Sequence, residues 1–130
     1  MGCCHYYASS EGGDTAFSID ISAINFGAGV LSELGDHARA RGIERVALMT
    51  DKVLGGLEHV AIARKSLAAA GIEVELYDEV RVEPTDQSFL AAAHFAGEGD
   101  FDGFVSLGGG SVIDTCKAAN LYSTHPADFL

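Results

Sequence analysis

FDGFVSLGGGSVIDTCKAANL, residues 101–121, places three consecutive glycines between an apolar run and an expected helix. The apolar, β-prone residues among its first seven predict a strand inside a sheet that is covered on both faces. Gly108, Gly109 and Gly110 follow, and without side chains they allow positive φ and let another molecule approach the main chain. A helix is expected to open at Ser111, where unpaired N–H groups and the positive end of the helix dipole attract an anion such as a phosphate.

A plain helix start is the alternative interpretation of this turn. Ser111 followed by Asp114 resembles a capping box in which Asp replaces the usual Glu or Gln. Three consecutive glycines exceed what a simple strand-to-helix turn needs, so we favour a phosphate-binding turn. The turn is neither GxxxxGK[ST] nor GxGxxG, whose last glycine position holds Ile113, and Lys117 lies too far along the helix to be a P-loop lysine.

Composition narrows the class of protein. The 130 residues suffice for one domain with a real core, and no apolar run approaches the ~18 residues of a membrane span. With 19 acidic and 8 basic residues, the net charge of −11 argues against nucleic acid as a partner. We therefore expect neither nucleic acid nor a membrane as partner, and a small anionic ligand remains compatible because helix N-termini attract anions locally.

The cysteines indicate a reducing compartment. Cys3, Cys4 and Cys116 are an odd and poorly spaced set for disulfides, and no signal or Arg-rich transit peptide is evident in the sequence. A cytoplasmic location is expected, or the mitochondrial matrix if a longer eukaryotic precursor exists. Residues 1–16 are interpreted as an irregular lead-in, because no second Cys/His cluster completes a metal site with Cys3, Cys4 and His5.

The rest of the chain alternates strands and helices. Residues 17–26 alternate as an extended hairpin, and Thr85 is expected to cap a helix. The pattern predicts strands at residues 44–50 and 72–77 and helices at residues 28–41, 57–70 and 86–96. This order predicts an α/β fold, a three-layer Rossmann-like parallel sheet with an N-terminal extended hairpin, and a dinucleotide-binding domain over residues 17–130.

Asp51 is the second candidate ligand-binding residue. In parallel α/β sheets ligands bind beyond the carboxyl ends of the strands, and Asp51 and the glycine turn both follow such ends. A carboxylate there accepts hydrogen bonds from the hydroxyls of an adenosine ribose, while the glycine turn holds a diphosphate. The pair suggests a dinucleotide, and a helix-capping or loop carboxylate is the alternative for Asp51.

Several linked stretches resemble the iron-containing alcohol dehydrogenase family: TDK at 50–52, VRVEPTD at 80–86 and GGGSVIDTCKAANL at 108–121. Within it, the combination of these stretches in longer form, LMTDK, YDEVRVEPTD and DTCKAANLY, with the opening CCHYY is similar to the hydroxyacid-oxoacid transhydrogenases. The resemblance implies the nucleotide-binding domain of a two-domain enzyme, followed in longer members by a helical domain that holds the metal.

The resemblance also implies roles for individual residues. Asp51 would contact the adenosine ribose and disfavour a 2′-phosphate, so NAD is preferred to NADP. Gly109, Gly110 and Ser111 would bind the diphosphate, and Gly108 is a further cofactor-binding residue of the same turn. Asp114 and Lys117 would lie near the nicotinamide end of the site.

The implied reaction is hydride transfer from a hydroxy acid such as 4-hydroxybutyrate to an oxo acid such as 2-oxoglutarate. A divalent metal, iron or zinc, is expected only in the full-length protein, where it polarises the alcohol oxygen. The alternatives are an NAD-dependent alcohol or lactaldehyde dehydrogenase of the same family and a non-catalytic nucleotide-binding module. A homo-oligomer is compatible with each.

Metal ligands and catalytic residues are not expected within these residues. No two of the five histidines have the i, i+3 or i, i+4 spacing of a helical metal site: His5, His37, His59, His94 and His125. The positions of the family's ligands would lie beyond Leu130. We therefore expect an N-terminal part of a longer enzyme, without catalytic activity by itself.

Overall fold

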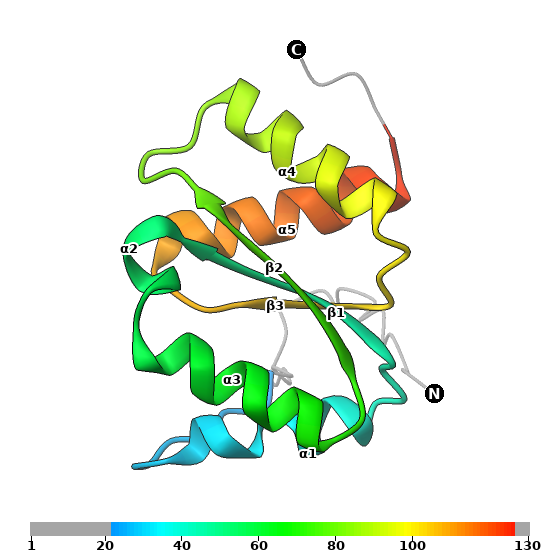
Figure 1. Ribbon diagram of the computed structural model, residues 1–130. Helices are drawn as coiled ribbons and strands as arrows, with labels where there is room; N and C mark the ends of the chain where they lie inside the picture. Colours follow the sequence, from blue (N-terminus) through cyan, green and yellow to red (C-terminus); the bar gives the residue numbers. More distant parts are fainter. Residues whose placement is uncertain (1–21, 127–130) are drawn as a thin grey trace, which may run out of the picture.

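A three-stranded parallel sheet forms the centre of the molecule. The computed structural model describes residues 22–126. Its strands are β1 (Arg45–Asp51), β2 (Glu73–Val80) and β3 (Gly103–Ser106), in the order β2-β1-β3, with both pairs parallel (Figure 1). The predicted α/β class and parallel pairing are confirmed.

Helices cover both faces of the sheet. On one side lie α4 (Asp86–Glu98) and α5 (Gly110–Thr124), and on the other lie α1 (Leu34–Arg39) and α3 (Glu58–Ala69) (Figure 1). The short α2 (Lys52–Gly55) directly follows β1. These positions make the three layers that the alternating order of strands and helices predicts.

The central strand β1 divides the core into two clusters. Ala47 and Met49 pack with side chains of α4 and α5, whereas Val46 and Leu48 pack with side chains of α1 and α3. All four are fully buried. Successive side chains of a strand point to opposite faces, so a strand covered on both sides needs an apolar residue at nearly every position. The run VALM in β1 meets this requirement.

The amino ends of the strands are held by one carboxylate. Asp102 precedes β3 and accepts hydrogen bonds from the backbone N–H groups of Arg45 at 2.8 Å and Glu44 at 2.9 Å. These two bonds lower the pKa of the Asp102 carboxyl, with the bond from Arg45 contributing most. The start of β1 is thereby fixed against the start of β3.

The N-terminal expectations need correction. Residues 17–21 of the expected hairpin lie outside the described residues, and residues 22–26 form no strand. Ile24 and Phe26 are 78% and 99% exposed, so the described part of the chain provides no surface on which such a strand would pack. The single helix expected at 28–41 is instead a 3₁₀ turn, η1 (Val30–Glu33), followed by α1, and Gly29 precedes it with a left-handed φ of 82°.

The remaining boundaries move by a few residues. β2 extends to Val80 rather than 77, and β3 begins only at Gly103. Thr85 caps α4 as predicted, and Ser88 completes a reciprocal capping box with it. The helix α2 was not predicted, because four residues are too few to show a helical period.

Candidate functional site

The glycine turn and Asp51 lie next to each other because β1 and β3 are neighbouring parallel strands. Leu107, just after β3, donates its N–H to the carbonyl of Met49 at 2.9 Å. The Leu107 carbonyl in turn accepts a 2.7 Å hydrogen bond from Thr50 Oγ1. Thr50 is fully buried and immediately precedes Asp51. The start of the glycine turn is thus fixed against the end of β1.

Helix α5 begins at Gly110, one residue earlier than expected. Gly109 is its N-cap, and the Gly109 carbonyl accepts from the N–H groups of Val112 at 3.1 Å and Ile113 at 3.0 Å. The capping box of Ser111 and Asp114, which was the alternative interpretation of this turn, does not form, because Ser111 is already inside the first turn. The N–H groups of Gly110 and Ser111 have no carbonyl one turn back within the helix, and they are available to an anion.

The three glycines have different surroundings. A Cβ added to Gly108 would lie 2.6 Å from Val112 Cγ2 and 3.2 Å from Leu54 Cδ1, so packing requires glycine there. A Cβ added to Gly109 or Gly110 would meet nothing within 4 Å. Packing within the described residues therefore does not explain these two glycines, whereas close approach of a ligand to the main chain would.

A cavity of about 190 Å³ joins the turn to Asp51. Its lining combines a carboxylate, the start of α5 and a valine wall: Asp51, Val80, Val82, Gly109, Gly110, Ser111 and Val112. The register of β1 with β2 shifts by one residue between Met49 and Asp51, so Val80 rather than Glu79 pairs with Asp51. Such irregularities commonly redirect side chains beside binding sites.

Asp51 also caps a helix, which was the alternative interpretation of this residue. Its Oδ1 accepts from the N–H groups of Val53 and Leu54, both at 2.9 Å, and so begins α2. Among the described residues no hydrogen bond reaches Oδ2. One carboxylate oxygen therefore positions the side chain, and the other is free to accept a hydrogen bond from a ligand hydroxyl.

Four of the seven predicted site residues line the cavity: Asp51, Gly109, Gly110 and Ser111. Gly108 lies beneath them against Val112. Asp114 and Lys117 are exposed on α5 and do not line the cavity. Their role at the nicotinamide end stays a prediction.

The sequence alone did not indicate Val80, Val82 or Glu83. The two valines belong to a wall that depends on the irregular register of β2, which no periodicity reveals. Glu83 donates its N–H to Ser111 Oγ at 3.3 Å and has a left-handed φ of 57°. The available signal was the string VRVEPTD at residues 80–86, which carries part of the family resemblance and contains all three residues.

The described residues do not fit a metal. Within residues 22–126 no group of three or more His, Cys, Asp or Glu side chains is arranged to hold an ion. Burial raises the pKa of the Cys116 thiol to about 11, so this side chain is a protonated core residue. No step of the chemistry is therefore assigned to a metal held by these residues.

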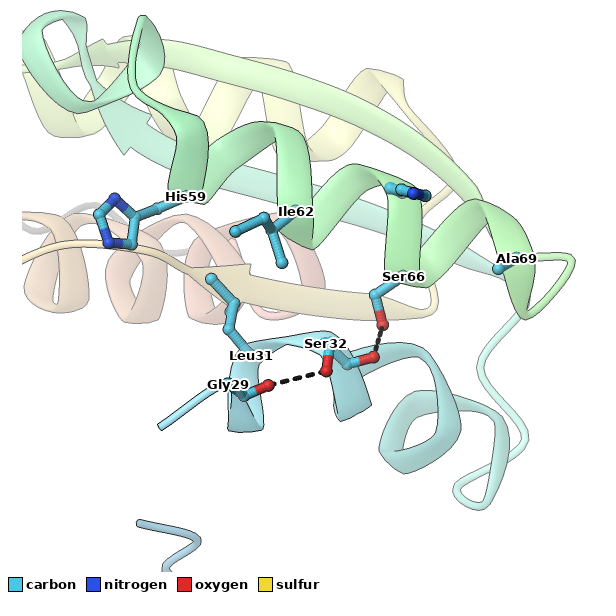
Figure 2. Close-up of a pocket in the computed structure, with 8 residues that line it drawn as sticks. Gly29, Leu31, Ser32, His59, Ile62, Ser66 and Ala69 are labelled. Atoms are coloured by element: carbon cyan, nitrogen blue, oxygen red, sulfur yellow. Dashed lines mark hydrogen bonds between the residues drawn. The ribbon is translucent and has the colours of Figure 1, made fainter. Parts of the chain in front are cut away.

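A second, larger cavity of about 580 Å³ lies between η1 and α3. Figure 2 shows Leu31 and Ile62 on its walls, with Ser66 hydrogen-bonded to Ser32 at 2.7 Å. Ser66 Oγ also accepts from the N–H of Gly35, so both functions of this hydroxyl are used within the fold. None of the residues that follow the carboxyl ends of the strands lines this cavity.

No helix within the described range, 22–126, is both long enough and apolar enough to cross a membrane.

The chain belongs to the iron-containing alcohol dehydrogenase family, whose model matches residues 22–130. It is 52% identical over 118 residues to the mitochondrial hydroxyacid-oxoacid transhydrogenase of Bos taurus and 51% identical over 118 residues to that of Homo sapiens. Each match covers 90% of this chain and 25% of the relative. The chain thus spans about a quarter of the length of these curated relatives.

Two solved dehydrogenase structures have the same fold as this chain. An archaeal halo-thermophilic alcohol dehydrogenase from a Red Sea brine pool superposes with a TM-score of 0.78 at 30% identity, over 88% of this chain and 28% of that one. An NADH-dependent butanol dehydrogenase from Thermotoga maritima superposes with a TM-score of 0.73 at 23% identity, over 78% of this chain and 26% of that one. At 23% identity, the comparison with the butanol dehydrogenase shows only that the fold is the same.

Proposed function

We propose that this chain supplies the NAD-binding site of a hydroxyacid-oxoacid transhydrogenase. The observation that carries the proposal is the open space over Gly109 and Gly110 at the start of α5, in one cavity with Asp51. Backbone N–H groups at a helix start suit a diphosphate, and a carboxylate at a neighbouring strand end suits a ribose. The transhydrogenase relatives support the kind of reaction.

Different residues of the cavity contact different parts of the cofactor. Gly109, Gly110 and Ser111 hold the diphosphate by main-chain N–H groups and one hydroxyl, and Gly108 supports the turn from beneath, where it packs against Val112. Oδ2 of Asp51 accepts a hydrogen bond from the adenosine ribose, and the Asp51 charge repels a 2′-phosphate. Asp114 and Lys117, one turn apart on α5, are assigned to the nicotinamide end.

When bound, NAD supplies the acceptor for a hydride from a hydroxy acid and the donor of a hydride to an oxo acid. The described residues bind and orient the cofactor, with residues 17–130 as the nucleotide-binding domain. Catalytic residues and the iron or zinc ligands are assigned to a second, helical domain. We place the enzyme in the mitochondrion rather than the cytoplasm, because its relatives are named as mitochondrial, and the matrix is the compartment that we expect there.

Replacing Asp51 by Asn tests the ribose contact. The Asn side chain still caps α2, since Asn is among the best N-cap residues, so the melting temperature should stay within about 2 °C of wild type. Loss of the charge should weaken NAD binding about tenfold and narrow the preference for NAD over NADP. Calorimetric titration of both cofactors into full-length protein from which retained nicotinamide has been removed measures this. Asp51→Ala is the comparison that loses the cap as well. Unchanged NAD affinity in both variants would remove Asp51 from the site.

An assay of the full-length enzyme tests the reaction. Incubation with 4-hydroxybutyrate and 2-oxoglutarate, without added nicotinamide, should give succinic semialdehyde and 2-hydroxyglutarate in equal amounts. An ordinary NAD-dependent dehydrogenase of the family would need free NAD and would form no 2-hydroxyglutarate without it. Product formation only after NAD is added would therefore exclude the transhydrogenase and retain the dehydrogenase.

A further inference from the structure

Glu83 has a backbone conformation that its sequence position disfavours. Its φ of 57° lies in the left-handed region, which residues with a Cβ rarely adopt. Pro84 follows it, and a proline favours extended geometry in the residue before it. Such strain persists only where the surrounding structure imposes it, and it is common at functional sites.

The surroundings of Glu83 impose this conformation from both sides. Val80, the last residue of β2, is buried and pairs with Asp51. Thr85 is fixed by its capping box, in which its N–H donates to Ser88 Oγ at 2.8 Å. Only residues 81–84 connect these two points. The connection must therefore turn sharply before Pro84, and Glu83 makes that turn.

The left-handed turn directs the backbone N–H of Glu83 toward Ser111. The N–H donates to Ser111 Oγ at 3.3 Å, and Ser111 lines the cavity beside Gly109 and Gly110. A hydroxyl oxygen that accepts a hydrogen bond must point its own proton elsewhere. The contact therefore leaves the Ser111 proton free to be donated to an anion at the glycine turn.

We propose that Glu83 is a positioning residue for the cofactor's diphosphate, acting through its backbone on the hydroxyl of Ser111. This inference rests on the proposed function. The Glu83 side chain is exposed and has no hydrogen bond or ion pair among the described residues, so the backbone conformation carries the effect. The loop between β2 and α4 thereby becomes part of the anion site.

The proposal is tested by replacing Glu83 with residues that differ in how readily they adopt a left-handed φ. Val strongly disfavours this region, whereas Asn and Gly accept it. Glu83→Val should weaken NAD binding to the full-length protein about tenfold, while Glu83→Asn and Glu83→Gly should bind within about twofold of wild type. Titration calorimetry measures the affinities, and circular dichroism melts verify that each variant is folded.

Repeating the Glu83→Val substitution in Ser111→Ala protein distinguishes an effect on the Ser111 hydroxyl from a general effect on the loop. In Ser111→Ala protein, Glu83→Val should cause no further loss of affinity, because the hydroxyl through which it acts is absent. Equal losses in both backgrounds would overturn the proposal, as would a folded Glu83→Val protein with wild-type affinity. If wild-type protein itself fails to bind NAD, the proposed function fails first and this inference fails with it.

Discussion

Gly110→Ala is expected to weaken NAD binding about a hundredfold without destabilising the fold. A Cβ at this position meets no atom of the described chain within 4 Å, so it would project into the space that we assign to the diphosphate. Gly110 is the first residue of α5, where alanine is a better helix former than glycine by up to about 1 kcal/mol. The NAD affinity should therefore fall while the free energy of unfolding rises. Titration calorimetry and urea unfolding of the same preparations measure the two quantities.

Gly108→Ala is the matched control, two residues away in the same turn. Its Cβ would lie 2.6 Å from Val112 Cγ2, so the substitution should lower the free energy of unfolding by about 1–3 kcal/mol through overpacking. Comparing the two variants distinguishes Gly108, which is needed for packing, from Gly110, which is needed for the ligand to approach the main chain. Wild-type NAD affinity in a folded Gly110→Ala protein would show that the diphosphate does not lie over this turn.

Much of the fold could be predicted because its strongest signals are local. The apolar run of β1 indicates a strand covered on both faces, and Thr85 marks the start of α4 where the structure has it. The N-terminal region was harder, since the pattern at residues 28–41 has a helical period but Gly29 and a 3₁₀ turn begin it. Apolar alternation at Ile24 and Phe26 also predicted a strand that the described part of the chain does not form.

The candidate site was predictable in its polar part only. Asp51 and the glycine turn follow strand ends, and the parallel pairing of β1 with β3 brings them together. The valine wall depends on a one-residue shift in register between β1 and β2, which follows from tertiary packing rather than from a local pattern. The same holds for Glu83, whose contact with Ser111 joins two segments 28 residues apart.

Gly35→Ala is expected to cause a large loss of stability, about 3 kcal/mol in the free energy of unfolding. An added Cβ would lie 2.2 Å from the carbonyl oxygen of Ser66 and 2.7 Å from its carbonyl carbon. Both are backbone atoms inside α3, so no rotamer change relieves the clash and α1 must move away from α3. That movement would also break the 2.9 Å hydrogen bond from the Gly35 N–H to Ser66 Oγ.

Gly97→Ala provides the control for a glycine in a helix without such a contact. Gly97 is exposed in α4, and a Cβ there meets nothing within 4 Å, so alanine should stabilise the protein by up to about 1 kcal/mol. Urea unfolding of the two variants beside wild type should place the stability of wild type between theirs.

Because Gly35 touches α3 and not the cavity at the strand ends, folded Gly35→Ala protein at low temperature should retain NAD affinity. A Gly35→Ala protein as stable as wild type would contradict the close approach of α1 to α3.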